Sequence, residues 1–172
     1  MMCRVFIEKE SVTRLEVDCV VNAANEGLWA GGGVCGAIFR EAGQQELEKA
    51  CRAIGHCDTG SAVLTPGFQL NAKYIIHAVG PRWQGGHHRE KELLQSCYRS
   101  ALKLAADNGC KSIGFPLISA GIFGYPKAKA WEVALRTTYA FPAELTVIFA
   151  VLDDDMLKLG KAVQQRLFPS DG

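Results

Sequence analysis

The sequence has no marked excess of charge of either sign, since 19 lysine and arginine residues are matched by 18 aspartate and glutamate residues. A formal net charge of +1 argues against nucleic-acid binding through charge alone. No apolar run approaches the ~20 residues that a membrane-spanning helix needs. The opening MMCRVFIEKE lacks the layout of a signal peptide, because its apolar stretch is short and charges follow at once. We therefore expect a cytoplasmic protein without membrane or nucleic-acid partners.

Cysteine spacing excludes further classes of site. The seven cysteines are odd in number and irregularly spaced, and no Cys-x-x-Cys pair occurs. This usage is typical of reduced cytosolic thiols rather than of a disulfide framework. Cys51, His56 and Cys57 lie close in the sequence, but their spacing matches no common zinc pattern. We expect neither a metal ion nor a cofactor.

The sequence does contain a regular alternation of strand-like and helix-like segments. Its 172 residues are a typical length for one domain, which we expect to span residues 1–172. Hydrophobic periodicity predicts strands over residues 4–8, 15–21, 62–65, 74–79, 112–116 and 145–152. It predicts helices over residues 34–42, 44–54, 90–108, 126–138 and 154–167. Alternation of this kind predicts an α/β fold with a mainly parallel sheet covered on both faces.

The most informative stretch is residues 20–43, where a short apolar run leads into Asn22, Asn25, three consecutive glycines and a helix. Glycines let the backbone pass close to a ligand, and the first turn of a helix offers unpaired N–H groups to a phosphate. Asparagine side chains both donate and accept hydrogen bonds, which suits sugar hydroxyls. A sharp turn without a ligand is the alternative, but small polar residues have little packing purpose there.

A second polar, glycine-containing loop, residues 117–125, follows the strand predicted over residues 112–116. In a parallel sheet, ligands bind beyond the carboxyl ends of the strands. Both glycine loops follow strands directly, so we expect both at the same edge of the sheet.

Five sequence blocks follow one another along the chain: VNAAN, GGGVCGAIFREAG, CDTGSAVLTPGF, HAVGP and FPLISAGIFGYP. Together they resemble the macrodomain family over nearly the whole chain. The resemblance is greatest to the MacroD-type members, which remove ADP-ribose from proteins and deacetylate O-acetyl-ADP-ribose. It implies a three-layer α/β/α fold with a mixed, mostly parallel sheet. It also implies that ADP-ribose, ADP-ribosylated protein or O-acetyl-ADP-ribose binds at the sheet edge. We expect a monomer.

The resemblance also implies roles for individual residues. Asn25 would bind the distal ribose and orient the scissile bond, and Cys35 stands at the second catalytic position. The implied ligand-binding residues are Ser11, Val12, Asn22, Ala23, Asn25, Gly32, Gly33, Val34, Cys35, Ser119, Ala120, Gly121, Ile122, Phe123, Gly124, Leu152 and Asp153. Backbone N–H groups from two loops can hold a diphosphate without a lysine, and Phe123 can cover a ribose face.

On the adenine side, two positions depart from the family pattern. Ser11 stands where the family usually has an aspartate that accepts a bond from the adenine amino group. Leu152 stands where an aromatic ring often packs on adenine. Asp153 could substitute as an acceptor, although a role as a helix cap explains it more simply. We expect adenine recognition to be weaker or differently made.

Cys35 is the third departure, because the MacroD type has a catalytic aspartate there. A thiol with an ordinary pKa of about 8.5 is a poor base at neutral pH. We see no histidine placed to partner it, and we interpret His77 as a structural residue at a strand end. We favour a mechanism in which a phosphate oxygen of the ligand positions the water while Asn25 and the loop backbones hold the geometry. A covalent thiol mechanism is the alternative.

Three functions stay open from the sequence. The chain is an enzyme that hydrolyses an ester of ADP-ribose, a reader that only binds ADP-ribose or a related nucleotide, or a domain for another ligand. That other ligand could be a differently linked ADP-ribose or an RNA end. Asn25 and the small residues around it favour the enzyme, whereas Ser11, Cys35 and Leu152 favour the other two. Fold analogy alone does not decide between them.

Overall fold

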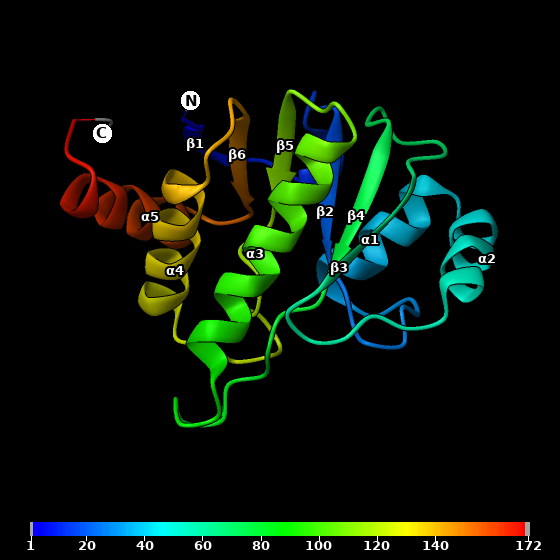
Figure 1. Cartoon of the computed structure of the whole chain (residues 1–172), viewed down its shortest axis with the longest axis horizontal. Helices are drawn as coiled ribbons and strands as arrows, with labels where there is room; N and C mark the ends of the chain where they lie inside the picture. Colours follow the sequence, from blue (N-terminus) through cyan, green and yellow to red (C-terminus); the bar gives the residue numbers. More distant parts are fainter. Residues whose placement is uncertain (1, 171–172) are drawn as a thin grey trace.

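In the computed structural model, which describes residues 2–170, a six-stranded sheet lies between two layers of helices (Figure 1). The strands are β1 (Arg4–Lys9), β2 (Cys19–Ala23), β3 (Ala62–Pro66), β4 (Tyr74–Ala78), β5 (Ser112–Phe115) and β6 (Thr146–Val151). The helices are α1 (Gly33–Ala42), α2 (Gln44–Ile54), α3 (Glu90–Asp107), α4 (Lys127–Ala140), α5 (Asp154–Leu167) and a short 3-10 helix, η1 (Val12–Arg14). Among residues 2–170, no helix is long and apolar enough to cross a bilayer.

The strand order is β1-β6-β5-β2-β4-β3, and every neighbouring pair is parallel except β3 with β4. Residues 67–73, which join these two strands, are too few for the crossover of about a dozen residues that a parallel pair needs. The turn is closed by the Gly67 N–H, which donates to the Lys73 carbonyl at 2.9 Å. The mixed, mostly parallel sheet that we expected is therefore confirmed.

Each face of the sheet buries its own apolar layer. Val21 and Ile76 face α3, α4 and α5, whereas Val20 and Ile75, one residue earlier, face α1 and α2. Side chains alternate between the two faces of a strand, so an unbroken apolar run is buried on both. The rings of Phe115 and Phe149 stack at 5.4 Å in the first layer. The three-layer α/β/α arrangement is confirmed.

Several element boundaries differ from those we expected. Strand β2 begins at Cys19, not at residue 15, although Leu15 and Val17 are buried. Leu15 instead packs on the backbone of Gly114, where an added Cβ would lie 2.6 Å from Leu15 Cδ1. Ile54, the last residue of α2, is exposed. The apolar pattern at residues 15–17 therefore indicated burial correctly but not a strand.

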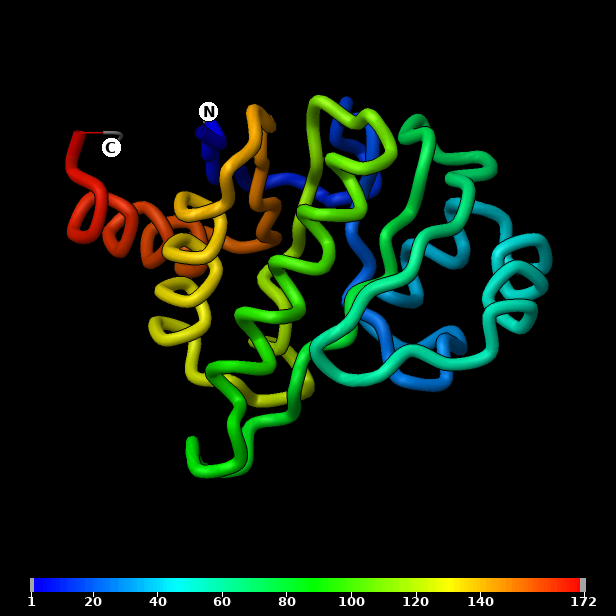
Figure 2. The backbone as a smooth tube through the Cα atoms, in the orientation of Figure 1, coloured from blue at the N-terminus to red at the C-terminus, as the bar shows by residue number. Residues whose placement is uncertain are grey.

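The parallel strands direct their carboxyl ends to one edge of the sheet. Figure 2 shows the segments that follow β2, β4 and β5 at the lower edge of the view. Ligand sites of open α/β sheets lie at this edge. The fold therefore brings both glycine loops to one place, as the sequence predicted.

Candidate functional site

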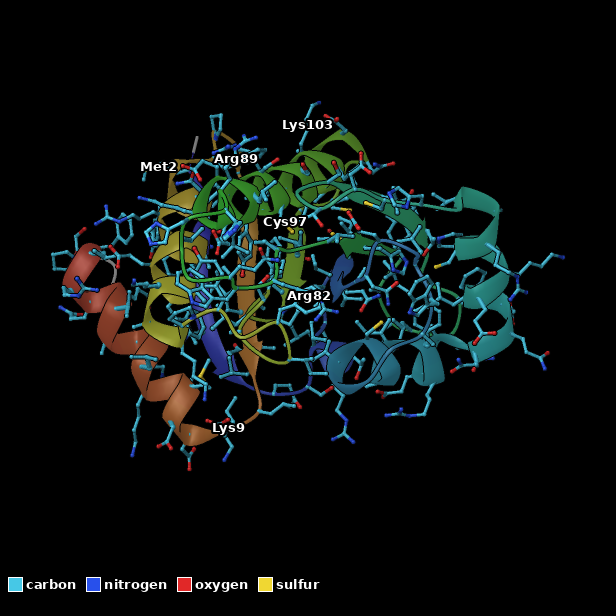
Figure 3. The ribbon with its side chains drawn as sticks, turned by 90° about the horizontal axis from the view of Figure 1, so that it is seen from below. Met2, Lys9, Arg82, Arg89, Cys97 and Lys103 are labelled. Carbon is cyan, nitrogen blue, oxygen red and sulfur yellow. The ribbon has the colours of Figure 1, made fainter. Side chains whose placement is uncertain are left out.

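A cleft of about 540 Å³ opens at this edge, within the range of about 300–1,000 Å³ that is usual for small-molecule sites. One wall comes from η1 and the start of α1, and the other comes from residues 116–123. Gly80, Arg82 and Leu152 also line the cleft. Figure 3 looks onto this edge and shows Arg82 near its centre.

The start of α1 offers unpaired N–H groups to the cleft. Gly32 is the N-cap residue in an extended conformation, and no side chain caps the helix. Gly33 has a φ of +57°, a left-handed conformation that glycine adopts without strain. The first N–H groups of a helix have no partner within it, and the helix dipole places partial positive charge there. This end of α1 suits a phosphate.

The loop formed by residues 119–125 faces α1 from the other side of the cleft. Within residues 2–170, the N–H groups of Gly121, Ile122 and Phe123 donate to no other group. The loop is closed behind them, since the N–H of Gly124 donates to the Gly121 carbonyl at 3.0 Å and that of Tyr125 to Ser119 at 2.9 Å. Two sets of backbone donors therefore face one cleft.

Ser119 is strained and incompletely bonded. Its φ is +69°, which is uncommon for a residue other than glycine. Its Oγ is buried and finds no partner within the described chain. Gly80 makes room for it, because a Cβ there would lie 2.3 Å from Ser119 Oγ. Strain and an orphaned hydroxyl in a cleft wall are typical of functional sites.

Asn25 lies at the end of the cleft near Phe123 with its amide already oriented. Its Nδ2 donates to the Trp29 carbonyl at 2.9 Å, and the Trp29 N–H donates to its Oδ1 at 3.1 Å. The amide plane is thereby fixed, while the second Nδ2 hydrogen and the second Oδ1 lone pair stay available. Trp29 itself is 66% exposed at the cleft mouth.

Cys35 lines the cleft above a buried polar network. Asn22 Nδ2 lies 3.6 Å from Cys35 Sγ and donates to His77 Nδ1 at 3.0 Å. Thr65 Oγ1 donates to the Pro66 carbonyl and therefore accepts from His77 Nε2 at 3.0 Å. Burial lowers the pKa of His77 to about 4, which keeps the imidazole neutral. The thiol thus has an amide rather than a base beside it, and His77 is structural.

At the opposite end of the cleft, Ser11 belongs to a chain of hydroxyl groups. Thr13 Oγ1 donates to Glu41 Oε2 at 2.9 Å, so it accepts from Ser11 Oγ at 2.8 Å. The lone pairs of Ser11 remain available, and the carboxylate at the end of the chain polarises the oxygen. Leu152 is 67% exposed at the same end. This end offers the Ser11 hydroxyl and the Glu10 carboxylate as acceptors, together with the apolar surface of Leu152.

Most of the residues that we expected at the site do line the cleft. They are Ser11, Val12, Ala23, Asn25, Gly32, Gly33, Val34, Cys35, Ser119, Gly121, Ile122, Phe123 and Leu152. Ala120 and Gly124 belong to the same loop but are not part of the lining.

Asn22 and Asp153 are not part of the lining of the cleft. Asn22 is fully buried and holds Cys35 and His77 from below. Asp153 caps α5 by accepting from the Met156 N–H at 2.8 Å. The cap was the simpler interpretation from the sequence.

Sequence reasoning missed Thr13, Trp29, Gly80 and Arg82, all of which line the cleft. Gly80 and Arg82 lie just beyond the end of β4. This position in the sequence indicated that they lie at the same edge of the sheet as the two glycine loops. The Arg82 guanidinium carbon lies 4.4 Å from the centre of the Phe123 ring, a distance typical of a cation–π contact. Arg82 thereby brings a positive charge to the cleft.

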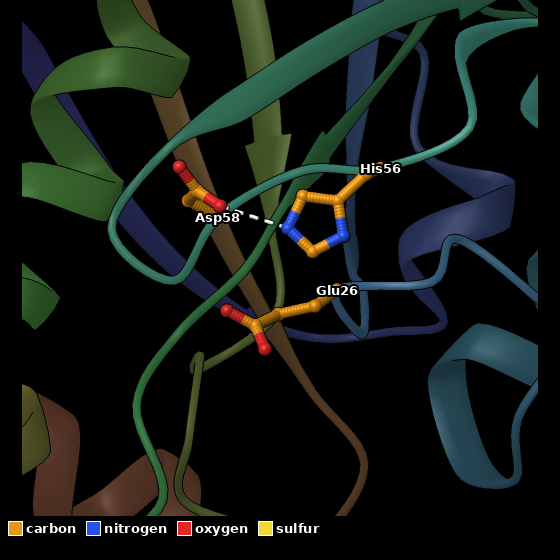
Figure 4. Close-up of side chains that lie close together, drawn as sticks. All are labelled: Glu26, His56 and Asp58. Atoms are coloured by element: carbon orange, nitrogen blue, oxygen red, sulfur yellow. Dashed lines mark hydrogen bonds and ion pairs between the residues drawn. The ribbon is translucent and has the colours of Figure 1, made fainter.

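One group of side chains in residues 2–170 places potential metal ligands within 4.8 Å of one another: Glu26, His56 and Asp58 (Figure 4). All three are exposed. His56 Nε2 lies 2.8 Å from Asp58 Oδ1, and the Glu26 carboxylate accepts from the N–H and hydroxyl of Thr59. These groups already bond one another and Thr59. Cys51 and Cys57, which we considered with His56, are buried and lie outside the group.

The comparison with family models decides the family. A model described as Macro domain matches residues 21–134. The chain belongs to the macrodomain family. This macrodomain is 47% identical over 169 residues to the O-acetyl-ADP-ribose deacetylase of Salmonella typhimurium, covering 92% of this chain and 93% of that protein. It is 49% identical over 160 residues to a Macro domain-containing protein of Mesorhizobium japonicum, covering 91% of this chain and 90% of that one.

Solved structures agree with the fold. The Oceanobacillus iheyensis macrodomain with ADP has a TM-score of 0.90 and 36% identity, covering 95% of this chain and 91% of that chain. The Trypanosoma brucei macrodomain in complex with ADP-ribose has a TM-score of 0.85 and 38% identity, covering 92% and 68%. The expected family and fold class are both confirmed.

Proposed function

We propose that this macrodomain binds ADP-ribose in the cleft and hydrolyses its esters. The substrates would be ADP-ribose joined to aspartate or glutamate of a protein, or O-acetyl-ADP-ribose. The two sets of unpaired N–H groups, at the start of α1 and at residues 121–123, support this proposal most strongly. The name of the Salmonella relative and the ligand of the Trypanosoma structure support it as well.

The residues that line the cleft indicate the orientation in which the ligand would bind. The adenine ring would lie between Ser11 and Leu152, where hydrogen-bond acceptors and an apolar surface are available. The diphosphate would accept bonds from the two sets of N–H groups, as anions do at helix starts and backbone concavities. The distal ribose would then lie beside Asn25 and under Phe123.

The site would promote hydrolysis by orienting the water and the ester, rather than by removing a proton from the water with a protein base. Water adds to the ester and cleaves it, giving free ADP-ribose and a carboxylic acid. A phosphate oxygen of the bound ligand would orient that water, and the fixed amide of Asn25 would hold the ribose. Preorganised groups of this kind need little rearrangement during the reaction.

Cys35 would shape the cleft rather than act as nucleophile. Its sulfur lies 3.6 Å from Asn22 Nδ2 and 3.8 Å from the Trp29 carbonyl. Neither group can take the thiol proton, and an activated thiol needs an adjacent base or a lowered pKa. The aspartate usual at this position would therefore not be required.

Product release from two substrates tests the function. Wild-type protein is incubated with O-acetyl-ADP-ribose and with a protein mono-ADP-ribosylated on glutamate, and free ADP-ribose is measured by liquid chromatography. Calorimetry measures ADP-ribose binding in parallel. We expect binding and release from at least one ester. Binding without any release would make the protein a reader, and the absence of both would reject the assigned ligand.

A further inference from the structure

A second cleft of about 410 Å³ adjoins the first. The two clefts share Asn25, Trp29, Gly80, Arg82 and Phe123 in their linings. None of the residues at the adenine end, such as Ser11 or Leu152, belongs to the second cleft. The second cleft therefore begins at the end of the first where we place the distal ribose.

One wall of the second cleft is a loop held in place by a buried carboxylate. Glu90 is 1% exposed, and it accepts from the N–H groups of Gln84 and Gly86 at 2.9 Å and of His88 at 2.6 Å. Burial raises the pKa of the Glu90 carboxyl, but these bonds outweigh it and lower the pKa to about 2. The carboxylate is therefore charged at neutral pH and fixes residues 84–88.

The same loop is joined to the ribose end of the first cleft. The Trp83 N–H donates to the Phe123 carbonyl at 2.8 Å, and the Trp83 ring packs on Tyr125 at 4.8 Å. Arg82 lies over the Phe123 ring. The two clefts therefore share a wall that is built before any ligand arrives.

We infer that the second cleft binds the peptide segment that bears the ester-linked ADP-ribose. This inference rests on the proposed function, because the cleft has an acyl side only if the bound ligand is an ester of ADP-ribose. The acyl group of any ester must leave the first cleft beside Asn25, where the second begins. An acetyl group fills only a small part of 410 Å³, whereas a few peptide residues match it.

The lining of the second cleft suits a peptide. Leu93 is partly exposed in this lining and offers apolar surface to the methylene groups of a modified glutamate. Glu26 and Gln84 are exposed at its edge and can accept or donate to peptide N–H and carbonyl groups. Peptide contacts in this cleft predict faster hydrolysis of protein esters, with no effect on the acetyl ester.

The test compares two substrates in matched variants. Gln84→Trp fills the second cleft, and its backbone N–H can still donate to Glu90. His87→Trp is the control, because His87 is exposed in the same loop and lines neither cleft. We expect Gln84→Trp to lower kcat/KM for a peptide ADP-ribosylated on glutamate about tenfold, and that for O-acetyl-ADP-ribose by less than about twofold. The control should match wild type on both.

A second variant removes a side chain instead of adding one. His88 lines the second cleft and His87 does not. His88→Ala, with His87→Ala as its control, should lower peptide turnover about threefold and again spare the acetyl ester. Equal losses on both substrates, or no loss on either, would overturn the inference. Wild type that deacetylates O-acetyl-ADP-ribose but releases nothing from the peptide would also overturn it. Wild type that acts on neither ester would instead reject the proposed function.

Discussion

The two ends of the ADP-ribose cleft differ in how firmly their side chains are held. At the ribose end, the amide of Asn25 is bonded on both sides to Trp29, and Phe123 is held by Arg82 and by the Trp83 N–H. At the adenine end, Leu152 is 67% exposed, and the Ser11 hydroxyl is bonded on one side only, to Thr13. The rigid end is the one where we place the reaction. We expect changes at the ribose end to alter turnover and changes at the adenine end to alter affinity.

Acid should lower the free energy of unfolding, because His77 is buried as a neutral imidazole. The pKa of His77 is about 4 in the fold against about 6.5 in an unfolded chain. Between these values the unfolded state binds more protons, so stability is complete above pH 6.5 and falls towards pH 4. The loss amounts to about 3 kcal/mol for this shift of the His77 pKa. Chemical denaturation as a function of pH measures it.

A His77→Gln variant is the control for this pH dependence. The amide that replaces the imidazole has no proton to gain, so the slope of stability between pH 6.5 and 4 should flatten. The carboxylate of Glu90, with a pKa of about 2, contributes its own loss only below its ordinary pKa of about 4.5. An equally steep slope in the His77→Gln variant would assign the effect to other groups.

Removing the carboxylate that holds the loop should lower turnover at the ribose end about tenfold. Glu90→Ala leaves three N–H groups without their acceptor and frees the loop that supports Phe123. Amide hydrogen exchange at residues 84–88 should rise together with the loss of kcat. Glu92→Ala, an exposed glutamate on the same helix, is the matched control. Unchanged exchange in Glu90→Ala would show that the loop is held by other contacts.

At the adenine end, Ser11→Asp should tighten ADP-ribose binding about fivefold and leave kcat unchanged. A carboxylate accepts a stronger bond from the adenine amino group, and the difference is worth about 1 kcal/mol. Thr13→Val, which breaks the link between Ser11 and Glu41, should weaken binding about twofold. Calorimetry measures both variants. A loss of affinity in Ser11→Asp would place adenine elsewhere.

Cys35→Ala should have the smallest effect, less than about threefold on kcat, because neither neighbour of the thiol can activate it. Cys35→Asp should match or exceed wild type. Circular dichroism checks that each variant is folded. A folded but inactive Cys35→Ala would revive the covalent thiol mechanism.

Much of the fold could be predicted from the sequence, because periodicity and caps are local signals. Helices α2 and α5 have the predicted bounds, and Asp153 caps α5 as its position indicated. The two glycine loops could be assigned to one edge because each follows a strand. Residues 15–17 were misassigned to a strand because burial alone leaves the backbone conformation open.

The features of the site that the sequence did not reveal arise from contacts between distant segments. The polarity of Asn22 indicated a ligand contact, but its side chain points to the face of β2 where His77 is buried. Trp29 and Arg82 line the cleft through loop conformations that local periodicity does not encode. The hydrogen-bonded chain from Ser11 through Thr13 to Glu41 joins η1 to α1. Sequence spacing does not predict a contact between residues so far apart.

The most direct test of the account is single-turnover release of ADP-ribose from a protein ADP-ribosylated on glutamate, measured for wild type and Asn25→Ala. Calorimetry of ADP-ribose binding accompanies both. The account predicts that Asn25→Ala releases ADP-ribose about 100-fold more slowly, while its dissociation constant changes by only a few-fold. Equal release by the two proteins would contradict the role given to Asn25.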